Sequence, residues 1–302
     1  MFTLYYLRHS ISLICGLMAT ATAIAQPWTG TIRANGESPV GLSSRFSFTE
    51  GPAVDKKGNV YFTDQPNNKI WKYSTDSMLT VFLHNAGRSN GMYFDKKGNL
   101  VTCADENNQL WSIAPDTSVK LILKDFNGIR FNGPNDLWIT KKGGIYFTDP
   151  YYKRDYWTNT KTTPTAQGVY FLAKNKRPVL VAGDLQKANG IVGTSDNKFL
   201  YVADIEADTT FKYSIKKDGT LGKKMFFAAK GSDGMTLDNK GNLYLTGKGV
   251  TVFNSAGVLI EHIDIPEPWT ANVCFGGKNR DVLFITAGKS VYSLRTKVRG
   301  VQ

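Results

Sequence analysis

Six short apolar segments of the chain each begin at a side chain that carries a carboxylate or amide oxygen. These residues are Glu50, Asn90, Asn135, Asn189, Asp233 and Asn272. Oxygen ligands suit a hard cation such as Ca²⁺, whereas zinc and copper sites usually contain imidazole or thiolate. The two acids, Glu50 and Asp233, would neutralise a divalent ion, and water or substrate would complete its shell of about six to eight oxygens.

An internal repeat sets the spacing of these residues. The stretch 51–64 returns as 91–105 and 136–149, each with an apolar strand, a Lys-Lys-Gly turn and a second strand followed by Asp. Looser copies cover 190–204, 234–247 and 273–288. The copies start roughly 40 to 55 residues apart, the spacing of four-stranded propeller blades. Six units predict an all-β, six-bladed β-propeller, in which equivalent positions meet at one axis. We call the six oxygen-bearing residues the ring residues.

A simpler interpretation exists for each ring residue by itself. Asn, Asp and Gly are common turn formers, so a single Asn-Gly pair indicates no more than a turn. Six such positions in register, two of them acidic, favour a shared polar site.

The strands of the repeat predict how the ring closes. In the first unit, 60–63, 69–73 and 79–83 follow the inner strand, with a tight turn at 56–59. The sixth unit has strands near 273–275, 282–285 and 291–294, and too little chain remains for a fourth. We expect a segment between Trp28 and Phe48 to supply it, because closure removes an exposed sheet edge. Residues 26–302 are then one domain.

The first 25 residues are typical of an export signal. Arg8 precedes an apolar run over 11–25, and Ala23-Ile24-Ala25 forms a small-x-small cleavage pattern. The run is too short for a transmembrane helix. We therefore expect an exported protein, periplasmic or secreted, with no membrane segment once the signal is removed.

Charge and cysteine usage limit the remaining function classes. The formal net charge is +12, but many lysines fall in the Lys-Lys-Gly turns, which predicts a solvated basic face opposite the ring residues. Nucleic-acid binding is disfavoured, because no groove of interleaved basic and aromatic residues is evident. Cys103 and Cys274 lie in different units, so buried free thiols are a simpler interpretation than a disulfide.

Several motifs together resemble one known family. They include Phe48-Thr-Glu-Gly-Pro-Ala53, Arg130-Phe-Asn-Gly-Pro-Asn-Asp-Leu137, Tyr146-Phe-Thr-Asp-Pro150, Ala188-Asn-Gly-Ile191, Ser232-Asp-Gly-Met235 and Asn272-Val-Cys-Phe-Gly-Gly277. The chain resembles the gluconolactonase, senescence-marker-protein and luciferin-regenerating-enzyme family of six-bladed propellers over nearly its whole length after the signal.

The resemblance implies roles for particular residues. Glu50, Asn189 and Asp233 would bind the metal, and Asn135 would contact metal or substrate. Arg130 would bind substrate, and Asp233 would also accept and donate the proton. Ca²⁺ is the preferred ion, with Mg²⁺, Mn²⁺ or Zn²⁺ as alternatives. Three further expectations come from the residues: substrate contacts at Asn90 and Asn272, and Tyr151 in a wall formed by the long aromatic loop 150–168.

The activity that the resemblance implies is metal-dependent hydrolysis of a cyclic ester, with a sugar lactone as the preferred substrate. A Lewis acid that polarises a carbonyl can also polarise a phosphoryl oxygen, so phosphotriester or aryl ester hydrolysis is an alternative. A different class is a non-catalytic exported propeller that binds carbohydrate. Asp149, Asp204 and Glu106, on the same face as the ring residues, would either assist catalysis or cap turns.

Overall fold

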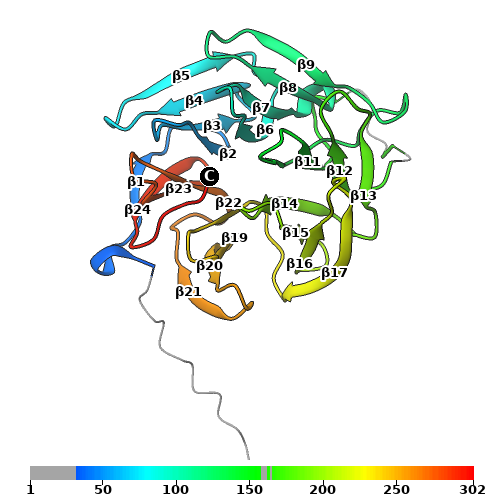
Figure 1. Ribbon diagram of the computed structural model, residues 1–302. Helices are drawn as coiled ribbons and strands as arrows, with labels where there is room; N and C mark the ends of the chain where they lie inside the picture. Colours follow the sequence, from blue (N-terminus) through cyan, green and yellow to red (C-terminus); the bar gives the residue numbers. More distant parts are fainter. Residues whose placement is uncertain (1–31, 158–161, 164) are drawn as a thin grey trace, which may run out of the picture.

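The fold is a six-bladed β-propeller (Figure 1). The computed structural model describes residues 32–157, 162–163 and 165–302. Its strands form six four-stranded antiparallel sheets arranged radially around one axis. The prediction of fold class and blade number is therefore confirmed. The expected signal peptide, residues 1–25, lies outside the described residues.

Each of the first five blades uses four consecutive strands, numbered outward from the axis. The bounds are β2 (Thr49–Val54), β3 (Val60–Asp64), β4 (Lys69–Tyr73) and β5 (Leu79–His84) in blade 1; β6 (Ser89–Phe94), β7 (Leu100–Ala104), β8 (Gln109–Ile113) and β9 (Val119–Leu123) in blade 2; β10 (Leu137–Ile139), β11 (Ile145–Thr148), β12 (Val169–Leu172) and β13 (Val179–Ala182) in blade 3; β14 (Ala188–Gly193), β15 (Phe199–Asp204), β16 (Thr209–Ile215) and β17 (Leu221–Ala228) in blade 4; β18 (Met235–Leu237), β19 (Leu243–Gly247), β20 (Gly249–Phe253) and β21 (Leu259–Ile263) in blade 5. Two short 3₁₀ turns, η1 (Ala34–Gly36) and η2 (Asp105–Asn107), are the helical elements of the described chain.

Blade 6 joins the two ends of the described chain. It consists of β22 (Thr270–Gly276), β23 (Val282–Ala287), β24 (Ser290–Arg295) and β1 (Val40–Ser43), which pairs antiparallel with β24. Figure 1 shows β1 beside β24. The predicted closure by a segment between Trp28 and Phe48 is confirmed. Its aromatic packing continues into blade 1, since the rings of Phe62 and Phe284 lie 5.5 Å apart.

The inner two strands of the blades are the most buried parts of the fold. Every residue of the innermost strands β2, β10, β14, β18 and β22 and of the second strands β3, β7, β11 and β19 is buried, whereas the outermost strands β5 and β9 have only half-buried and exposed positions. Cys103 and Cys274 are buried free thiols, as predicted. No helix of the described chain is long or apolar enough to cross a membrane.

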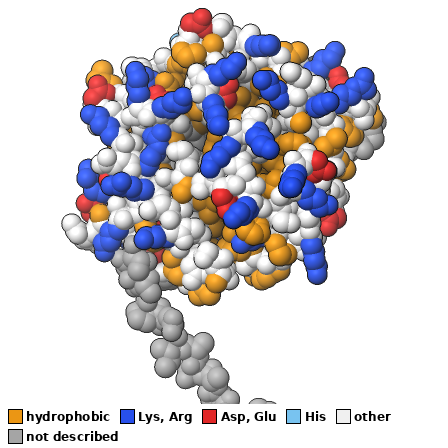
Figure 2. All heavy atoms as spheres, in the orientation of Figure 1, with side chains coloured by type: hydrophobic (Ala, Val, Ile, Leu, Met, Phe, Trp, Pro, Cys, Tyr) orange, Lys and Arg blue, Asp and Glu red, His pale blue; other side chains and the backbone are white. Residues whose placement is uncertain are grey.

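The Lys-Lys-Gly turns produce a basic face. In the first turn, the carboxylate of Asp55 accepts hydrogen bonds from the backbone N–H groups of Lys57 and Asn59, while the lysine side chains are exposed. Asp95 makes the same contacts in the second turn. The acids are therefore occupied by the backbone, and the lysines remain in solvent. Figure 2 shows the resulting abundance of Lys and Arg over one face of the molecule.

Candidate active site

The ring residues lie at or just before the start of the innermost strands. Glu50, Asn90, Asn189 and Asn272 fall within β2, β6, β14 and β22, and in each of these strands the ladder to the next strand is irregular beside the ring residue. A bulge at the inner end of a strand redirects a side chain, and bulges are common beside active sites. The regular sheet therefore breaks where the side chains turn toward the axis.

Close approach between neighbouring blades explains the glycine that follows several ring residues. A Cβ atom added to Gly51 would lie 2.0 Å from the backbone oxygen of Asn90 in the next blade. A Cβ atom on Gly234 would lie 1.9 Å from Cγ of Asn272. Packing between blades at the axis, rather than a hairpin turn, therefore requires these glycines. The interpretation of these pairs as simple turns does not account for this contact.

A cavity of about 240 Å³ opens among the ring residues. Its lining includes four of them together with residues of the connecting loops: Phe48, Glu50, Gln65, Asn90, Asn135, Tyr152, Arg154, Ile205, Asp233 and Trp269. Asn189 reaches the cavity wall through Tyr152, since its Nδ2 donates to the tyrosine hydroxyl at 2.8 Å. Asn272 reaches it through Glu50, since its Nδ2 donates to Oε2 at 3.1 Å. The structure thus brings all six predicted ring residues to one place.

Two of these side chains carry buried acceptors without a partner. Oδ1 of Asn189 and Oδ1 of Asn90 have no hydrogen-bond partner among the described residues, although Asn189 is 1 % exposed and Asn90 is 4 % exposed. Buried polar atoms are normally satisfied, so an unpaired oxygen at a cavity indicates a missing ion, water or ligand. A hard cation would supply such a partner.

The carboxylates of the cavity disfavour each other when both are charged. Burial raises the pKa of Glu50 well above its usual value, and the charges of Asp233 and Asp136 raise it further. Burial also raises the pKa of Asp233. A bound divalent cation would offset this repulsion, so the donor set fits a hard ion. The described residues contain no group of three or more His, Cys, Asp and Glu side chains suited to a metal, so amide oxygens would have to contribute.

Asp136 is a buried acid beside the cavity whose role sequence reasoning missed. Burial raises its pKa to about 7. Asp136 follows the ring residue Asn135, at the position that glycine takes after Glu50 and Asn90. Its Oδ1 lies so close to Gly91 that a Cβ atom added to this glycine would be 2.3 Å from it. Blade 3 therefore fills the gap left by the glycine of blade 2.

The aspartates at the ends of the second strands of blades 1, 3 and 4 fix the backbone before the ring residues. Asp64 accepts hydrogen bonds from the N–H groups of residues 47 and 48, three and two positions before Glu50. Asp149 does so for residues 132 and 133, before Asn135. Asp204 does so for residues 186 and 187, before Asn189. These contacts agree with a structural role for Asp149 and Asp204, one of the two interpretations above.

In blade 2 the place of Asp64 is taken by Ala104, the last residue of β7, and the acid Asp105 follows one position later with different partners. Its Oδ2 accepts hydrogen bonds from Nε of Arg154 at 2.9 Å, from Nε2 of Gln65 at 3.2 Å and from the hydroxyl of Tyr156. Its backbone oxygen accepts from Nε1 of Trp157 at 2.9 Å. The aspartate therefore anchors the loop after β11 and carries Tyr152 and Arg154 to the cavity.

Three predicted substrate residues lie outside the lining of this cavity: Arg130, Tyr151 and Asn272, the last of which is bonded to Glu50. Arg130 donates from Nη1 to Oδ1 of Asn108 at 2.8 Å, and its guanidinium lies 5.8 Å from the ring of Trp157. Tyr151 packs its ring 6.2 Å from the same tryptophan. The cationic side chain that lines the cavity is Arg154 instead. Sequence reasoning missed Arg154 and Trp269, because neither lies in the repeat.

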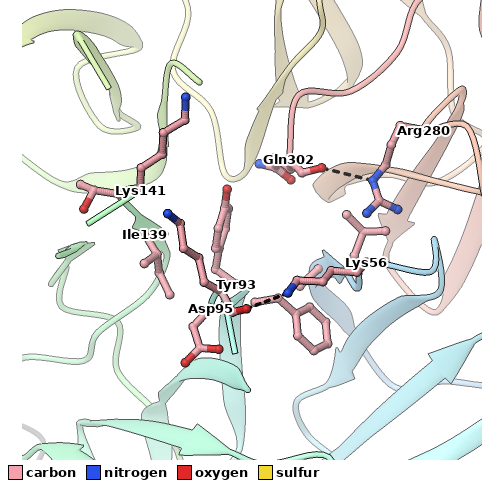
Figure 3. Close-up of a pocket in the computed structure, with 12 residues that line it drawn as sticks. Lys56, Tyr93, Asp95, Ile139, Lys141, Arg280 and Gln302 are labelled. Carbon is pink, nitrogen blue, oxygen red and sulfur yellow. Dashed lines mark hydrogen bonds between the residues drawn. The ribbon is translucent and has the colours of Figure 1, made fainter. Parts of the chain in front are cut away.

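The axis has a second opening on the basic face. A cavity of about 280 Å³ there is lined by the far ends of inner strands, by Lys56, Lys141 and Arg280, and by Gln302. Figure 3 shows Arg280 beside Gln302, whose backbone oxygen accepts from Nε at 3.2 Å. A smaller cavity of about 20 Å³, lined by residues that include Pro52 and Asp136, shares Tyr93 and Gln302 with this opening.

Comparison with known proteins agrees with this geometry. Residues 48–289 match the family model described as the SMP-30/Gluconolactonase/LRE-like region. The chain belongs to this family. The match begins two residues before Glu50 and extends beyond Asn272, so it contains every ring residue.

Relatives within the SMP-30/gluconolactonase/LRE-like family include gluconolactonases. A gluconolactonase of Zymomonas mobilis is 30% identical over 293 aligned residues, covering 86% of this chain and 81% of the relative. The structure of a putative gluconolactonase superposes with a TM-score of 0.84 at 26% identity, covering 90% of this chain and 96% of that one. A gluconolactonase from Xanthomonas campestris gives 0.80 at 25% identity, covering 90% and 99%. Membership and relatives together indicate a hydrolase of lactones.

Proposed function

We propose that this protein is a metal-dependent lactonase that opens a sugar lactone. The observation that carries the proposal is the convergence of Glu50 and Asp233 at one cavity, with Asn189 bonded to Tyr152 of its wall and Oδ1 of Asn189 buried and unpaired. The gluconolactonase relatives support the lactone as substrate. We propose Ca²⁺ as the ion, because carboxylate and amide oxygens prefer a hard cation.

The proposed roles follow from the chemistry of each group. A divalent cation held by Glu50, Asn189 and Asp233 would polarise the lactone carbonyl and stabilise the negative charge that develops there. Asp233 accepts a proton from the attacking water as the new C–O bond forms. The proton then passes to the ring oxygen as the ester C–O bond breaks, which leaves a hydroxy acid.

The remaining cavity residues would bind and orient the sugar. Asn90 and Asn135 offer amide groups to ring hydroxyls, and Arg154 offers guanidinium donors. Because Arg154 is already paired with Asp105, its charge is balanced, which favours a neutral polyhydroxylated ligand over an anionic one. Phe48 and Trp269 provide apolar surface for the C–H faces of the ring.

A hydrolysis panel tests the proposed function. The protein lacking residues 1–25 is assayed on sugar lactones, aryl esters and phosphotriesters, before and after chelation, with Ca²⁺, Mg²⁺, Mn²⁺ or Zn²⁺ restored. We expect lactone hydrolysis that chelation abolishes and Ca²⁺ restores best. Turnover that is indifferent to the chelator would refute the metal-dependent mechanism. Absence of turnover on every ester would favour a carbohydrate-binding propeller.

Export is a separate part of the proposal. It rests on Arg8, the apolar run over 11–25 and the Ala23-Ile24-Ala25 pattern. Fractionation of expressing cells, followed by N-terminal sequencing of the exported form, tests it. The expected first residue of that form is Gln26, and a chain that keeps Met1 in the cell would contradict the proposal.

A further inference from the structure

Three of the predicted metal ligands, Glu50, Asn189 and Asp233, each have one polar atom held by a neighbour. Asn272 donates to Oε2 of Glu50 from within the ring. The other two ligands, Asn189 and Asp233, are held by aromatic residues, Tyr152 and Trp269, which belong to loops outside the repeat. Both aromatic residues line the cavity. Neither Tyr152 nor Trp269 lies in a repeated segment, so the repeat does not predict either contact.

Tyr152 pairs with the donor end of the Asn189 amide. An asparagine amide has a donor end and an acceptor end of nearly equal size, so a neighbour must fix its orientation. Here Nδ2 donates to the Tyr152 hydroxyl at 2.8 Å, and Oδ1 is the atom left without a partner. Metal ions bind the oxygen of an amide, so this orientation is the one that a hard cation requires.

Trp269 acts on Asp233 in a corresponding way. Its Nε1 donates to Oδ2 at 2.7 Å across 36 residues of chain. Trp269 is 40% exposed, so burial of the indole ring alone does not explain why the ring lies against Asp233. Because an indole nitrogen is a donor only, the bond favours the ionised carboxylate and restricts its rotation.

The loop that carries Tyr152 is itself fixed. The guanidinium of Arg154 lies 5.4 Å from the Tyr152 ring, and Nζ of Lys187 lies 5.0 Å from it. Arg154 in turn is paired with Asp105, which is 3% exposed. A series of contacts therefore runs from blade 2 through the loop after β11 to Asn189 in blade 4.

We propose that Tyr152 and Trp269 are positioning residues for the cation site, which orient Asn189 and Asp233 so that one oxygen of each is presented to the ion. The inference rests on the proposed function, because it presumes that these residues bind a cation. Outer contacts of this kind commonly change metal affinity about 10- to 100-fold when they are removed.

Two conservative variants, Tyr152→Phe and Trp269→Phe, test the proposal. Each keeps an aromatic ring and removes one hydrogen bond to a predicted ligand. Matched controls are Tyr213→Phe and Trp71→Phe, because the Tyr213 hydroxyl and the Trp71 Nε1 are buried without a partner in the described structure and neither residue lines the cavity. The probe is Ca²⁺ alone, titrated by calorimetry into each metal-free protein.

We expect Ca²⁺ affinity to fall at least about 10-fold in each test variant and to stay within about 2-fold of wild type in each control. The Tm in chelator should change no more in the test variants than in the controls, which separates positioning from a general loss of stability. If wild type binds Ca²⁺ and both test variants bind it equally well, the positioning role is wrong while the proposed function stands. If wild type binds none of Ca²⁺, Mg²⁺, Mn²⁺ and Zn²⁺, both proposals fail.

Discussion

Asp105 and Arg154 form an ion pair, with Nε 2.9 Å from Oδ2, that ties blade 2 to the loop after β11 in blade 3. The acids Asp64 and Asp149, at the ends of the second strands of their blades, instead bind the backbone that precedes their own ring residues. In blade 2 Ala104 takes that place, and the next residue, Asp105, positions the loop at the cavity.

Replacing Asp105 by Asn should release the loop. The variant leaves Arg154 without its anion, and we expect the free energy of unfolding to fall by roughly 1–3 kcal/mol, as for other polar groups that lose a charged partner. Catalytic efficiency on the lactone should fall about 10-fold, because a displaced loop misplaces substrate contacts. Steady-state kinetics and urea unfolding measure the two effects. Asp116→Asn, at an exposed turn, is the control; equal kinetics in the two variants would contradict the role of the ion pair.

Asp233→Asn separates an enzyme from a binding protein. It keeps the shape of the side chain but removes the proposed proton acceptor, so lactone turnover should fall by about 10²- to 10⁴-fold. Circular dichroism should remain that of wild type. A variant that retains most of its turnover would show that another group accepts the proton.

Removal of the cation should lower thermal stability. A ligand that binds only the folded state stabilises it by about 2.7 kcal/mol when present at 100 times its Kd. We therefore expect the Tm to rise as Ca²⁺ is added to chelated protein and to depend on its concentration. Glu50→Gln provides the control, since loss of one carboxylate should reduce the shift. A Tm unaffected by all four cations would count against the site.

The glycine after Asp233 should be essential for packing. A Cβ atom on Gly234 would lie 1.9 Å from Cγ of Asn272, so Gly234→Ala should destabilise the fold by about 1–3 kcal/mol, the usual cost of overpacking. Gly41→Ala is a matched control, because its nearest neighbour would be Cε1 of Tyr292 at 3.6 Å, an ordinary contact. Urea unfolding compares the free energy of unfolding of the two variants. Equal values would mean that the neighbouring blades can move apart to admit the methyl group without loss of stability.

The stability of the metal-free protein should fall as the pH rises. Burial raises the pKa of Asp149 to about 8, well above the ordinary value of 3.8 for an aspartate. The folded state therefore keeps a proton that the unfolded chain releases, and the free energy of unfolding decreases between about pH 4 and pH 8. Urea unfolding in chelator at pH 5 and pH 8 measures the slope. Asp149→Asn should have a smaller slope than wild type, and an identical slope would show that Asp149 is ionised at neutral pH.

The parts of the fold that the sequence predicted are those encoded by the repeat. Near-copies at 51–64, 91–105 and 136–149 define the inner strands, the basic turns and the register of the ring residues. Closure by β1 followed from a strand missing in the sixth unit. These inferences succeed because equivalent residues of a radial repeat have equivalent positions.

The loop contributions could not be predicted in this way. Arg154 and Trp269 lie outside the repeat, so no spacing argument relates them to the axis. The sequence repeat aligns Asp105 with Asp64, but the strand pairing places Ala104 at that position and Asp105 one residue later, where it contacts the loop. Arg130 was expected to bind substrate, yet its guanidinium contacts Asn108, a choice set by tertiary packing.

The pairing of β1 with β24 means that the sixth blade cannot be completed until residues separated by almost the whole polypeptide have met. Glu50 and Asn272 stand on either side of that junction and are joined by a hydrogen bond across 222 positions of sequence. Separation of β1 from β24 would pull these two side chains apart. The ring-residue cavity and the β1–β24 pairing should therefore unfold together in one cooperative transition.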